Sequence, residues 1–384
     1  MRGIYVHVPF CIRKCAYCDF YSVPAGREAM ADFRDLLVRE MDLFRTEQPA
    51  EAEAPADTVY FGGGTPTALG SDSLVKLLAA IRDRFRVADD AETTTEANPG
   101  AVSAADFAAL RAGGFNRVSI GVQSFDPASL ATLGRIHGAS EIRAAWRDGR
   151  AAGIPSLGID LIFGIPGQTR ASFAADLERT AALLPSHVSA YALAPEPGTP
   201  LHAAVERGEL RMPPDDAVAE MYEDARRILS AAGLRRYEIS NFARPGAECR
   251  HNLKYWRRDG YRGFGPSAHG LLFPGARAPL GLRTANPPSL AEYGRRIRQG
   301  RLPWTEVRAC DRGDAWRESL IFGLRETGGV DVARIEKGIG APPPELRDAV
   351  EDLVATGRLL RDGSRLRLPE SLLFVSNEVL QRLA

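Results

Sequence analysis

The sequence has no excess of charge of either sign, because lysine and arginine together number 49 and aspartate and glutamate also number 49. A neutral chain exerts no general electrostatic attraction on a polyanion, so we expect no binding to nucleic acid. No apolar run approaches the roughly 20 residues that a membrane-spanning helix needs. We therefore expect partners that are small molecules or proteins, and membrane association that is at most peripheral.

Cysteine is also scarce, with five residues in a chain of 384, an odd number. The first residues lack the basic start and the apolar core of a secretion leader. Both features argue against a disulfide-stapled secreted domain, and reduced cysteines indicate the cytoplasm. Cys249 and Cys310 are isolated in the sequence, and the default role of such a residue is that of a small buried hydrophobe.

The other cysteines stand together in the segment Cys11-Ile-Arg-Lys-Cys15-Ala-Tyr-Cys18. This spacing brings three thiolates onto one short loop, enough to bind three irons of a [4Fe-4S] cluster and leave the fourth iron without a protein ligand. An open metal position is reactive, as it is in catalytic zinc sites. A structural zinc is the alternative, but it needs four ligands, and His7 lies in the preceding strand rather than on the loop.

Short β-rich runs alternate with helical patterns along the first half of the chain. A helix over residues 28–46 carries Phe33, Leu36, Met41 and Phe44 at the spacing of a buried stripe. Parallel neighbours need crossover helices, so the alternation predicts an α/β fold, a full or partial (β/α)6 barrel with its chemistry at the carboxyl ends of the strands. The predicted strands are 3–8, 57–61, 92–96, 116–122, 157–163 and 187–193, and the further helices are 71–84, 103–112, 139–152 and 169–183.

Polar and glycine-rich residues fall at the ends of these predicted strands. Gly62-Gly63-Gly64-Thr65-Pro66 follows one strand, and glycines there let a ligand approach the backbone amides. Individually, each polar residue is as well explained as a helix cap or an ion-pair partner. Together, at successive strand ends facing a cysteine loop, they describe a pocket. The polar residues are Glu96 and Gln123 at strand ends, Arg135 in the segment that follows Gln123, and Asp160 within the strand 157–163.

These motifs resemble the radical S-adenosylmethionine (SAM) superfamily, and within it the group that contains oxygen-independent coproporphyrinogen III dehydrogenase and a family of haem chaperones, HemW. The resemblance covers nearly the whole chain. It rests on the cysteine loop with Tyr17, on the Gly-Gly-Gly-Thr-Pro turn, and on residues 95–100, 121–125 and 237–243.

The resemblance implies a role for each strand-end residue. Cys11, Cys15 and Cys18 ligate a [4Fe-4S] cluster, and SAM binds to its free iron. In the superfamily, an electron from the cluster reduces SAM and releases a 5′-deoxyadenosyl radical. Gly63, Gly64 and Thr65 contact the amino-acid end of SAM, and Glu96 and Arg135 its polar groups. Tyr5, Gln123, Asp160 and Ala194 complete the SAM pocket.

Two departures separate this chain from the dehydrogenase. Phe20 stands where the dehydrogenase loop has a further cysteine, and the first strand begins almost at Met1, without the dehydrogenase's N-terminal extension. Cys249-Arg-His251-Asn252-Leu-Lys-Tyr255-Trp256 contains the motif that marks the chaperone family, in which the histidine is implicated in holding haem.

Haem binding at this motif also has a chemical rationale. Imidazole is a usual axial ligand of haem iron, and adjacent aromatics offer a flat apolar surface. A capping loop and core packing are the alternative reading of the motif. His251 is therefore the expected haem ligand and Cys249 an alternative, whereas His269 has no role beyond a possible second-site contact.

The remaining chain is expected to be accessory. Residues 48–56 and 272–289 are predicted surface loops, rich in Pro and Ala. Helices near 313–326, 331–338 and 345–356, followed by a hairpin at Asp362-Gly363, predict a small winged-helix-like domain. The helix that enters a DNA groove in such domains carries more acids than bases here, so we expect a packing or lid domain. The predicted divisions are 1–195, 196–300 and 301–384.

From these features we expect a haem chaperone that passes haem to an acceptor protein and uses an electron donor. The alternative is an oxygen-independent coproporphyrinogen III dehydrogenase or another radical-SAM tetrapyrrole enzyme, and a scaffold protein with a zinc-filled loop is a third possibility. The metal bound by the cysteine loop separates the third reading from the first two, because only the first two require an iron–sulfur cluster.

Overall fold

The computed structural model describes residues 1–24 and 26–384. Within them, twelve strands form one sheet in the order β14-β13-β12-β11-β1-β4-β5-β6-β7-β8-β10-β9. The run from β11 to β8 is parallel, and the strands at both edges are antiparallel. The parallel strands are β11 (Tyr261–Phe264), β1 (Arg2–Val8), β4 (Ala56–Gly63), β5 (Val87–Ala97), β6 (Arg117–Gln123), β7 (Ser156–Phe163) and β8 (His187–Ala192).

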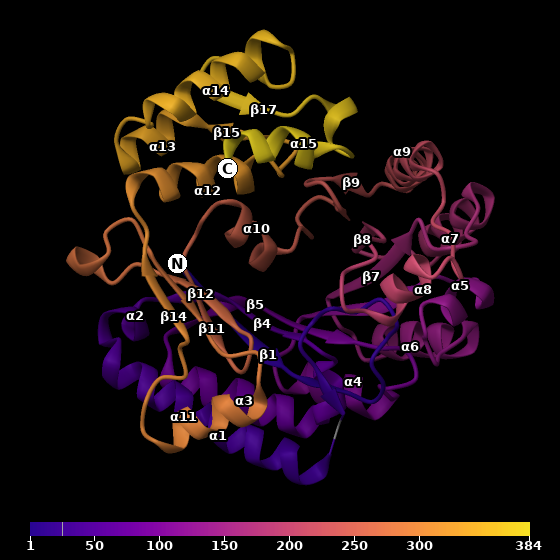
Figure 1. The fold of residues 1–384 in the computed structure, drawn as a ribbon. Coiled ribbons are helices and arrows are strands. Elements are labelled where there is room, and N and C mark those ends of the chain that lie inside the picture. The colour runs from indigo at the N-terminus through magenta and orange to yellow at the C-terminus, as the bar shows by residue number, and fades with distance from the viewer. Residues whose placement is uncertain (25) are drawn as a thin grey trace.

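Helices follow the parallel strands and cover the outside of the curved sheet (Figure 1). The helix α1 buries Phe33, Leu37, Met41 and Phe44 against the sheet, as its spacing predicts. The curved parallel sheet with its outer helices therefore confirms the predicted α/β partial barrel. These helices are α1 (Arg27–Glu47), α3 (Ser71–Arg84), α4 (Ala104–Ala112), α5 (Pro127–Thr132), α6 (Ala139–Ala151) and α7 (Arg170–Ala182).

The sheet continues past the predicted boundary at residue 195. β10 (Asn241–Ala243) pairs with β8, and β9 (Arg235–Arg236) pairs with β10. At the opposite edge β11 lies parallel to β1 and is extended by β12 (His269–Leu272), β13 (Leu282–Ala285) and β14 (Glu306–Ala309). The divisions at 195 and 300 therefore stay predictions. The helices of this region are α8 (Pro200–Glu206), α9 (Asp215–Ala231), α10 (Arg250–Trp256) and α11 (Leu290–Arg298).

Two predicted surface loops are only partly loops. Residues 48–56 contain the short helix α2 (Pro49–Glu53), where Glu51 and Ala52 are buried and Glu51 pairs with Arg2. Residues 272–289 contain β13, which pairs with β12. Proline and alanine predict exposed chain in both segments. Pro49, Ala50 and Gly275–Arg277 are exposed, whereas Glu51 and β13 are held by partners distant in the sequence.

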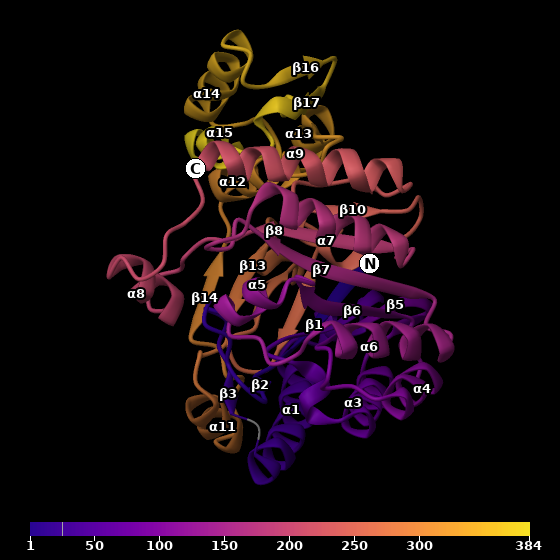
Figure 2. The same cartoon turned by 90° about the vertical axis from the view of Figure 1, so that its right-hand side faces the viewer.

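The C-terminal region forms the winged-helix-like domain that the sequence predicts, and Figure 2 shows it above the barrel in yellow. Its hairpin turns at Asp362-Gly363-Ser364-Arg365, which contains the predicted Asp-Gly turn. No helix of the described residues is long and apolar enough to cross a membrane. The domain's elements are α12 (Arg312–Gly323), β15 (Val330–Asp331), α13 (Val332–Ile339), α14 (Pro344–Ala355), β16 (Leu360–Asp362), β17 (Arg365–Arg367) and α15 (Ser376–Leu380).

Candidate functional site

The cysteine loop is fixed against the glycine-rich turn that follows β4. The short strand β2 (Phe10–Cys11) leads into it, and β3 (Val23–Pro24) pairs with β2 after it. The amide of Thr65 donates to the carbonyl of Phe10 at 2.7 Å. A Cβ on Gly64 would lie 2.7 Å from that same carbonyl oxygen and 3.1 Å from Cys11 Sγ, so only glycine allows this approach.

Cys11, Cys15 and Cys18 are half-buried free cysteines. They line a cavity of about 560 Å³, which we call the cysteine cavity. Within the described residues, no group of three or more His, Cys, Asp or Glu side chains is arranged to hold a single metal ion. The strand-end residues that the sequence predicts line the same cavity: Gly63, Gly64, Thr65, Glu96, Gln123, Arg135, Asp160 and Ala194.

Arg135 connects the cysteines to the polar wall of the cysteine cavity. One of its terminal nitrogens, Nη1, donates to Cys15 Sγ at 3.4 Å, and Nη2 donates to Asn98 Oδ1 at 2.6 Å and to the carbonyl of Gly121 at 2.7 Å. Its Nε is buried without a hydrogen-bond partner in the described structure. Because a buried unpaired donor is costly, this atom suits an anionic ligand group.

Asn98, two residues after Glu96 in the chain, is a further polar residue on the wall of the cysteine cavity. Its amide Nδ2 donates to Thr65 Oγ1 at 2.8 Å, and that hydroxyl lies 3.5 Å from Cys11 Sγ. Asn98 therefore joins Arg135 to the cysteine loop through one hydrogen-bonded chain. The signal that could have found it is its position two residues after a strand-end carboxylate.

Two buried carboxyl groups face the cysteine cavity from neighbouring strands. Burial raises the pKa of Glu96 to about 7, although the hydroxyl of Tyr60 donates to Glu96 Oε1 at 2.7 Å and opposes the shift. Burial also raises the pKa of Asp160, which accepts a hydrogen bond from the hydroxyl of Ser119 at 2.8 Å. A cationic ligand would compensate for the lost solvation of such groups, so this wall favours a positive charge.

Gln123 ends β6 in a backbone conformation that is uncommon for a residue with a side chain. Its φ is 65°, and the pairing of β6 with β7 shifts register between Gly121 and Gln123. Strained positions of this kind cluster at ligand sites. The bulge turns the Gln123 side chain into the cysteine cavity at the point where the parallel ladder is interrupted.

The structure places His251 in an aromatic cluster and not on the wall of the cysteine cavity. Its side chain is only 1% exposed, and its ring stacks on that of Tyr60 with 5.2 Å between centroids. Both ring nitrogens are occupied, since Nδ1 lies 2.8 Å from Thr58 Oγ1 and Nε2 lies 2.9 Å from the hydroxyl oxygen of Tyr255. Burial lowers the pKa of His251 to about 3, so the imidazole is neutral.

Cys249 and Asn252, from the same motif, do line the cysteine cavity. The thiol of Cys249 points to Glu92 Oε1 at 3.7 Å, and burial raises its pKa to about 12. Burial therefore disfavours the free thiolate at this position. The sequence does not predict that these two residues line this cavity. Their position depends on the packing of α10 against segments that are distant in the sequence.

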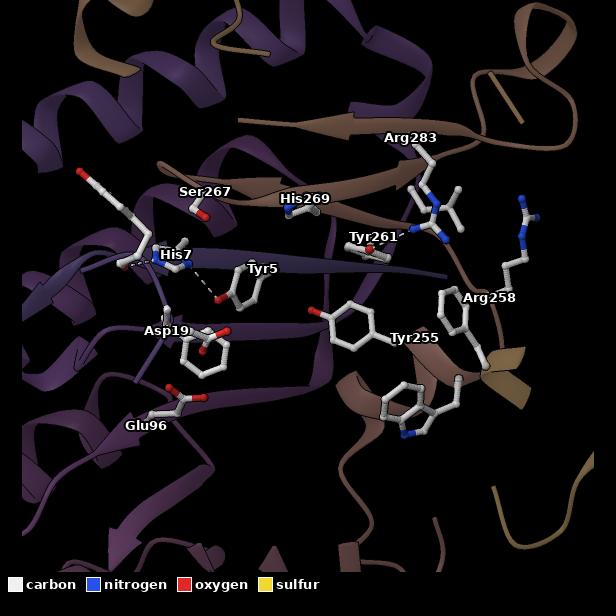
Figure 3. A pocket seen from close by; sticks show the side chains of 16 residues that line it. Tyr5, His7, Asp19, Glu96, Tyr255, Arg258, Tyr261, Ser267, His269 and Arg283 are labelled. Carbon is white, nitrogen blue, oxygen red and sulfur yellow. Dashed lines mark hydrogen bonds between the residues drawn. The ribbon is translucent and has the colours of Figure 1, made fainter. Parts of the chain in front are cut away.

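A second cavity, of about 610 Å³, adjoins the first, and we call it the aromatic cavity. Figure 3 shows Tyr5, Tyr255 and Tyr261 along its length, and Trp256 also lines it. Tyr5, which the sequence assigned to the SAM pocket, lines this cavity instead of the first. The two cavities share a wall made by Asp19, Phe20, Gly63 and Glu96.

Comparisons with known families match two parts of the chain. Residues 5–180 match the Radical SAM superfamily, and residues 311–371 match the HemN C-terminal domain. The first match covers the cysteine loop and the predicted strand-end residues through Asp160. The second covers most of the winged-helix-like domain.

Curated proteins named Heme chaperone HemW are similar over most of this chain. One, from Mycobacterium tuberculosis strain CDC 1551 / Oshkosh, is 39% identical over 95% of this chain and 90% of its own length. Another, from Bacillus subtilis strain 168, is 33% identical over 99% of this chain and 98% of its own. The solved structure of coproporphyrinogen III oxidase (HemN) from Escherichia coli, a radical SAM enzyme, has a similar fold, with a TM-score of 0.83 and 24% identity. The match covers 100% of this chain and 90% of that protein's chain.

Proposed function

Because the chain belongs to the radical SAM superfamily and, within it, to the HemW family, we propose that it is a haem chaperone. In this proposal it binds haem and passes it to an acceptor protein. The observation that carries the proposal is the similarity to proteins named Heme chaperone HemW, which extends over 95% and 99% of this chain. The acceptor protein and an electron donor are part of the proposal.

Membership of the superfamily implies a [4Fe-4S] cluster and SAM. We assign the cluster to Cys11, Cys15 and Cys18, because these free cysteines share one loop and one cavity. The cavity of about 560 Å³ that these cysteines line offers space for such a group. When bound, a reduced cluster of this type supplies an electron to the sulfonium of SAM.

The residues around the cysteine cavity suit the charges of SAM. The unpaired Nε of Arg135 can donate to its carboxylate, while Glu96 and Asp160 favour its cationic groups. Gly63, Gly64 and Thr65 offer backbone and hydroxyl contacts at the amino-acid end. We assign the surrounding surface to Gln123 and Ala194 in this cavity and to Tyr5 in the adjoining one.

The chaperone motif by itself predicts His251 as the haem ligand. Its two hydrogen bonds, to Thr58 and Tyr255, mean that iron can reach it only after one of them breaks. Tyr255 and Trp256 of the same motif line the aromatic cavity, which supports a macrocycle near this part of the fold.

The function is tested by reconstituting the full chain without oxygen and measuring iron, acid-labile sulfide and haem binding on one sample. We expect an iron–sulfur cluster and saturable haem binding with one haem per chain. Conversion of coproporphyrinogen III to protoporphyrinogen by the same sample would instead identify the dehydrogenase. A sample that holds zinc without iron or sulfide would remove radical chemistry from the proposal.

A further inference from the structure

The imidazoles around the aromatic cavity differ in whether their nitrogens are available to a metal. His7 and His269 line the cavity, and His251 packs behind Tyr5 with its ring stacked on the tyrosine ring. Iron binds imidazole through a ring nitrogen that carries no proton and has no competing hydrogen bond. The hydrogen bonds of each ring therefore decide which of these histidines can serve.

His7 is engaged at both nitrogens, as His251 is. Its Nε2 lies 2.9 Å from the carbonyl oxygen of Tyr21 and must therefore donate to it. Its Nδ1 lies 3.3 Å from the hydroxyl of Tyr5. His7 is only 4% exposed, so its ring is held within the wall of the cavity.

His269 is different. It is the first residue of β12, its side chain is exposed, and it lines the aromatic cavity between Ser267 and Tyr261 (Figure 3). Neither of its ring nitrogens has a hydrogen-bond partner among the described residues, in contrast to His7 and His251. His269 is thus the imidazole at this cavity that can bind a metal without first losing a hydrogen bond.

The walls of the aromatic cavity are flat and apolar over much of their area. Tyr5, Tyr255, Trp256 and Tyr261 contribute rings, and Phe322 comes from α12 of the winged-helix-like domain. Aromatic faces pack well against a planar macrocycle. The volume of about 610 Å³ lies within the range of cofactor sites, which is roughly 300–1,000 Å³.

One end of the cavity carries positive charge. Arg258 and Arg283 lie there, away from Asp19 and Glu96 (Figure 3). Both pair with the single carboxylate of Glu318, Arg258 at 2.7 Å and Arg283 at 2.8 Å. Two guanidinium groups sharing one carboxylate leave a net positive charge and N–H donors in excess, which suits the carboxylates of a ligand.

We propose that the aromatic cavity binds haem, with His269 as the iron ligand and with Arg258 and Arg283 facing the propionates. The inference rests on the proposed function, since it takes haem as the cargo, and it assigns a site and a ligand that differ from His251. Because the cavity shares Gly63 and Glu96 with the cysteine cavity, the bound macrocycle lies next to the proposed SAM site.

The test compares haem with iron-free protoporphyrin, which has the same ring and carboxylates but offers no metal. Dissociation constants are measured by absorbance titration of the full chain. We expect the wild type to bind haem at least about tenfold more tightly than protoporphyrin, because only haem can form an iron–imidazole bond. In His269→Ala this preference falls to about twofold or less, while protoporphyrin binding is retained, a pattern that general damage to the fold does not produce.

Two further variants complete the design. Arg283→Gln weakens haem and protoporphyrin equally, because both carry the propionates, and Glu318 keeps its pair with Arg258. His202→Ala is the matched control, since this half-buried histidine of α8 lies outside the aromatic cavity and contacts Glu206. It binds both ligands as the wild type does.

The outcomes separate the inference from the proposed function. A wild type that binds no haem defeats both. A wild type that binds haem, with the preference for iron kept in His269→Ala, overturns the inference and leaves the function standing. If a folded His251→Ala variant instead loses the preference for haem over protoporphyrin, the iron ligand belongs to the chaperone motif. That result also overturns the inference.

Discussion

The cysteine cavity and the aromatic cavity share a wall but are assembled in different ways. The cysteine cavity takes most of its polar groups from the ends of adjacent parallel strands, such as Glu96 on β5 and Gln123 on β6, and Arg135 joins them to the cysteines. The aromatic cavity takes its walls from segments as distant as Tyr5 on β1 and Phe322 on α12. A cavity of the first kind follows from the topology of a parallel sheet, whereas one of the second kind depends on packing between distant segments.

The two cavities also differ in how well their polar groups are satisfied. Thr65, Asn98 and Arg135 form one hydrogen-bonded chain in the cysteine cavity and leave the Nε of Arg135 for a ligand. In the aromatic cavity, His7 is hydrogen-bonded within the protein, whereas His269 lines the cavity without a hydrogen-bond partner among the described residues. If each cavity holds its own ligand, substitutions in one should leave binding in the other largely intact.

The largest expected effect is loss of the cluster. Cys18→Ala removes one of the three proposed cluster ligands, and we expect most of the reconstituted iron and sulfide to be lost. Cys310→Ala is the matched control, because Cys310 is 7% exposed and packs with Tyr261 and Leu271, outside the cysteine cavity. Iron and sulfide analysis measures the effect. An equal iron content in the reconstituted wild type and Cys18→Ala would falsify the assignment. Haem titration of both variants checks that the aromatic cavity stays intact.

Arg135→Gln should have the next largest effect. It removes the positive charge that faces Cys15 and a ligand carboxylate, and a charged hydrogen bond contributes about 1.5–3 kcal/mol, equivalent to about tenfold to a hundredfold in the affinity for SAM. Equilibrium dialysis of the reconstituted protein measures this loss. Haem affinity should remain unchanged, and an equal loss for both ligands would contradict the separation of the two cavities.

A smaller effect is expected from pH. Burial raises the pKa of Glu96 to about 7, so the carboxyl is neutral below this pH and ionised above it. Because SAM is cationic at its sulfonium, its affinity should rise by a few-fold between about pH 6 and pH 8. Glu96→Gln cannot ionise, and it should bind SAM more weakly with a flatter pH profile. A wild-type profile that falls over this range would reverse the sign and exclude Glu96 as the cause.

Cys249→Ser should have the smallest effect. The thiol of Cys249 is buried, its pKa is raised to about 12, and it lines the cysteine cavity and not the aromatic cavity, so we expect it not to contact haem iron. We expect the haem absorbance spectrum and the dissociation constant to stay within about twofold of wild type. A large spectral change would instead support Cys249 as the axial ligand.

Patterns within single segments predicted the barrel well. The alternation over residues 157–163 matches β7 at Ser156–Phe163, and the stripe over 28–46 matches α1 at Arg27–Glu47. These elements depend on local periodicity, which is visible in the chain itself. The strand-end residues followed for the same reason, because parallel strands bring their carboxyl ends to one edge.

Segments whose partners are distant were predicted less well. β13 was taken for a loop, because its burial depends on pairing with β12. The left-handed backbone of Gln123 likewise comes from an interruption in the pairing of β6 with β7. The sequence motif around His251 also gave no sign that both ring nitrogens are occupied by Thr58 and Tyr255.

The amino-acid sequence by itself determined the order of strands and helices, the loop that carries Cys11, Cys15 and Cys18, and the polar residues at the strand ends, because these follow from short-range spacing. Only the tertiary structure decided which histidine faces a cavity, which thiol is buried, and where the rings of Tyr5, Tyr255 and Phe322 meet. Those outcomes depend on contacts between residues hundreds of positions apart. No single segment of the sequence determines which hydrogen bonds form, or which side chains are buried, at such contacts.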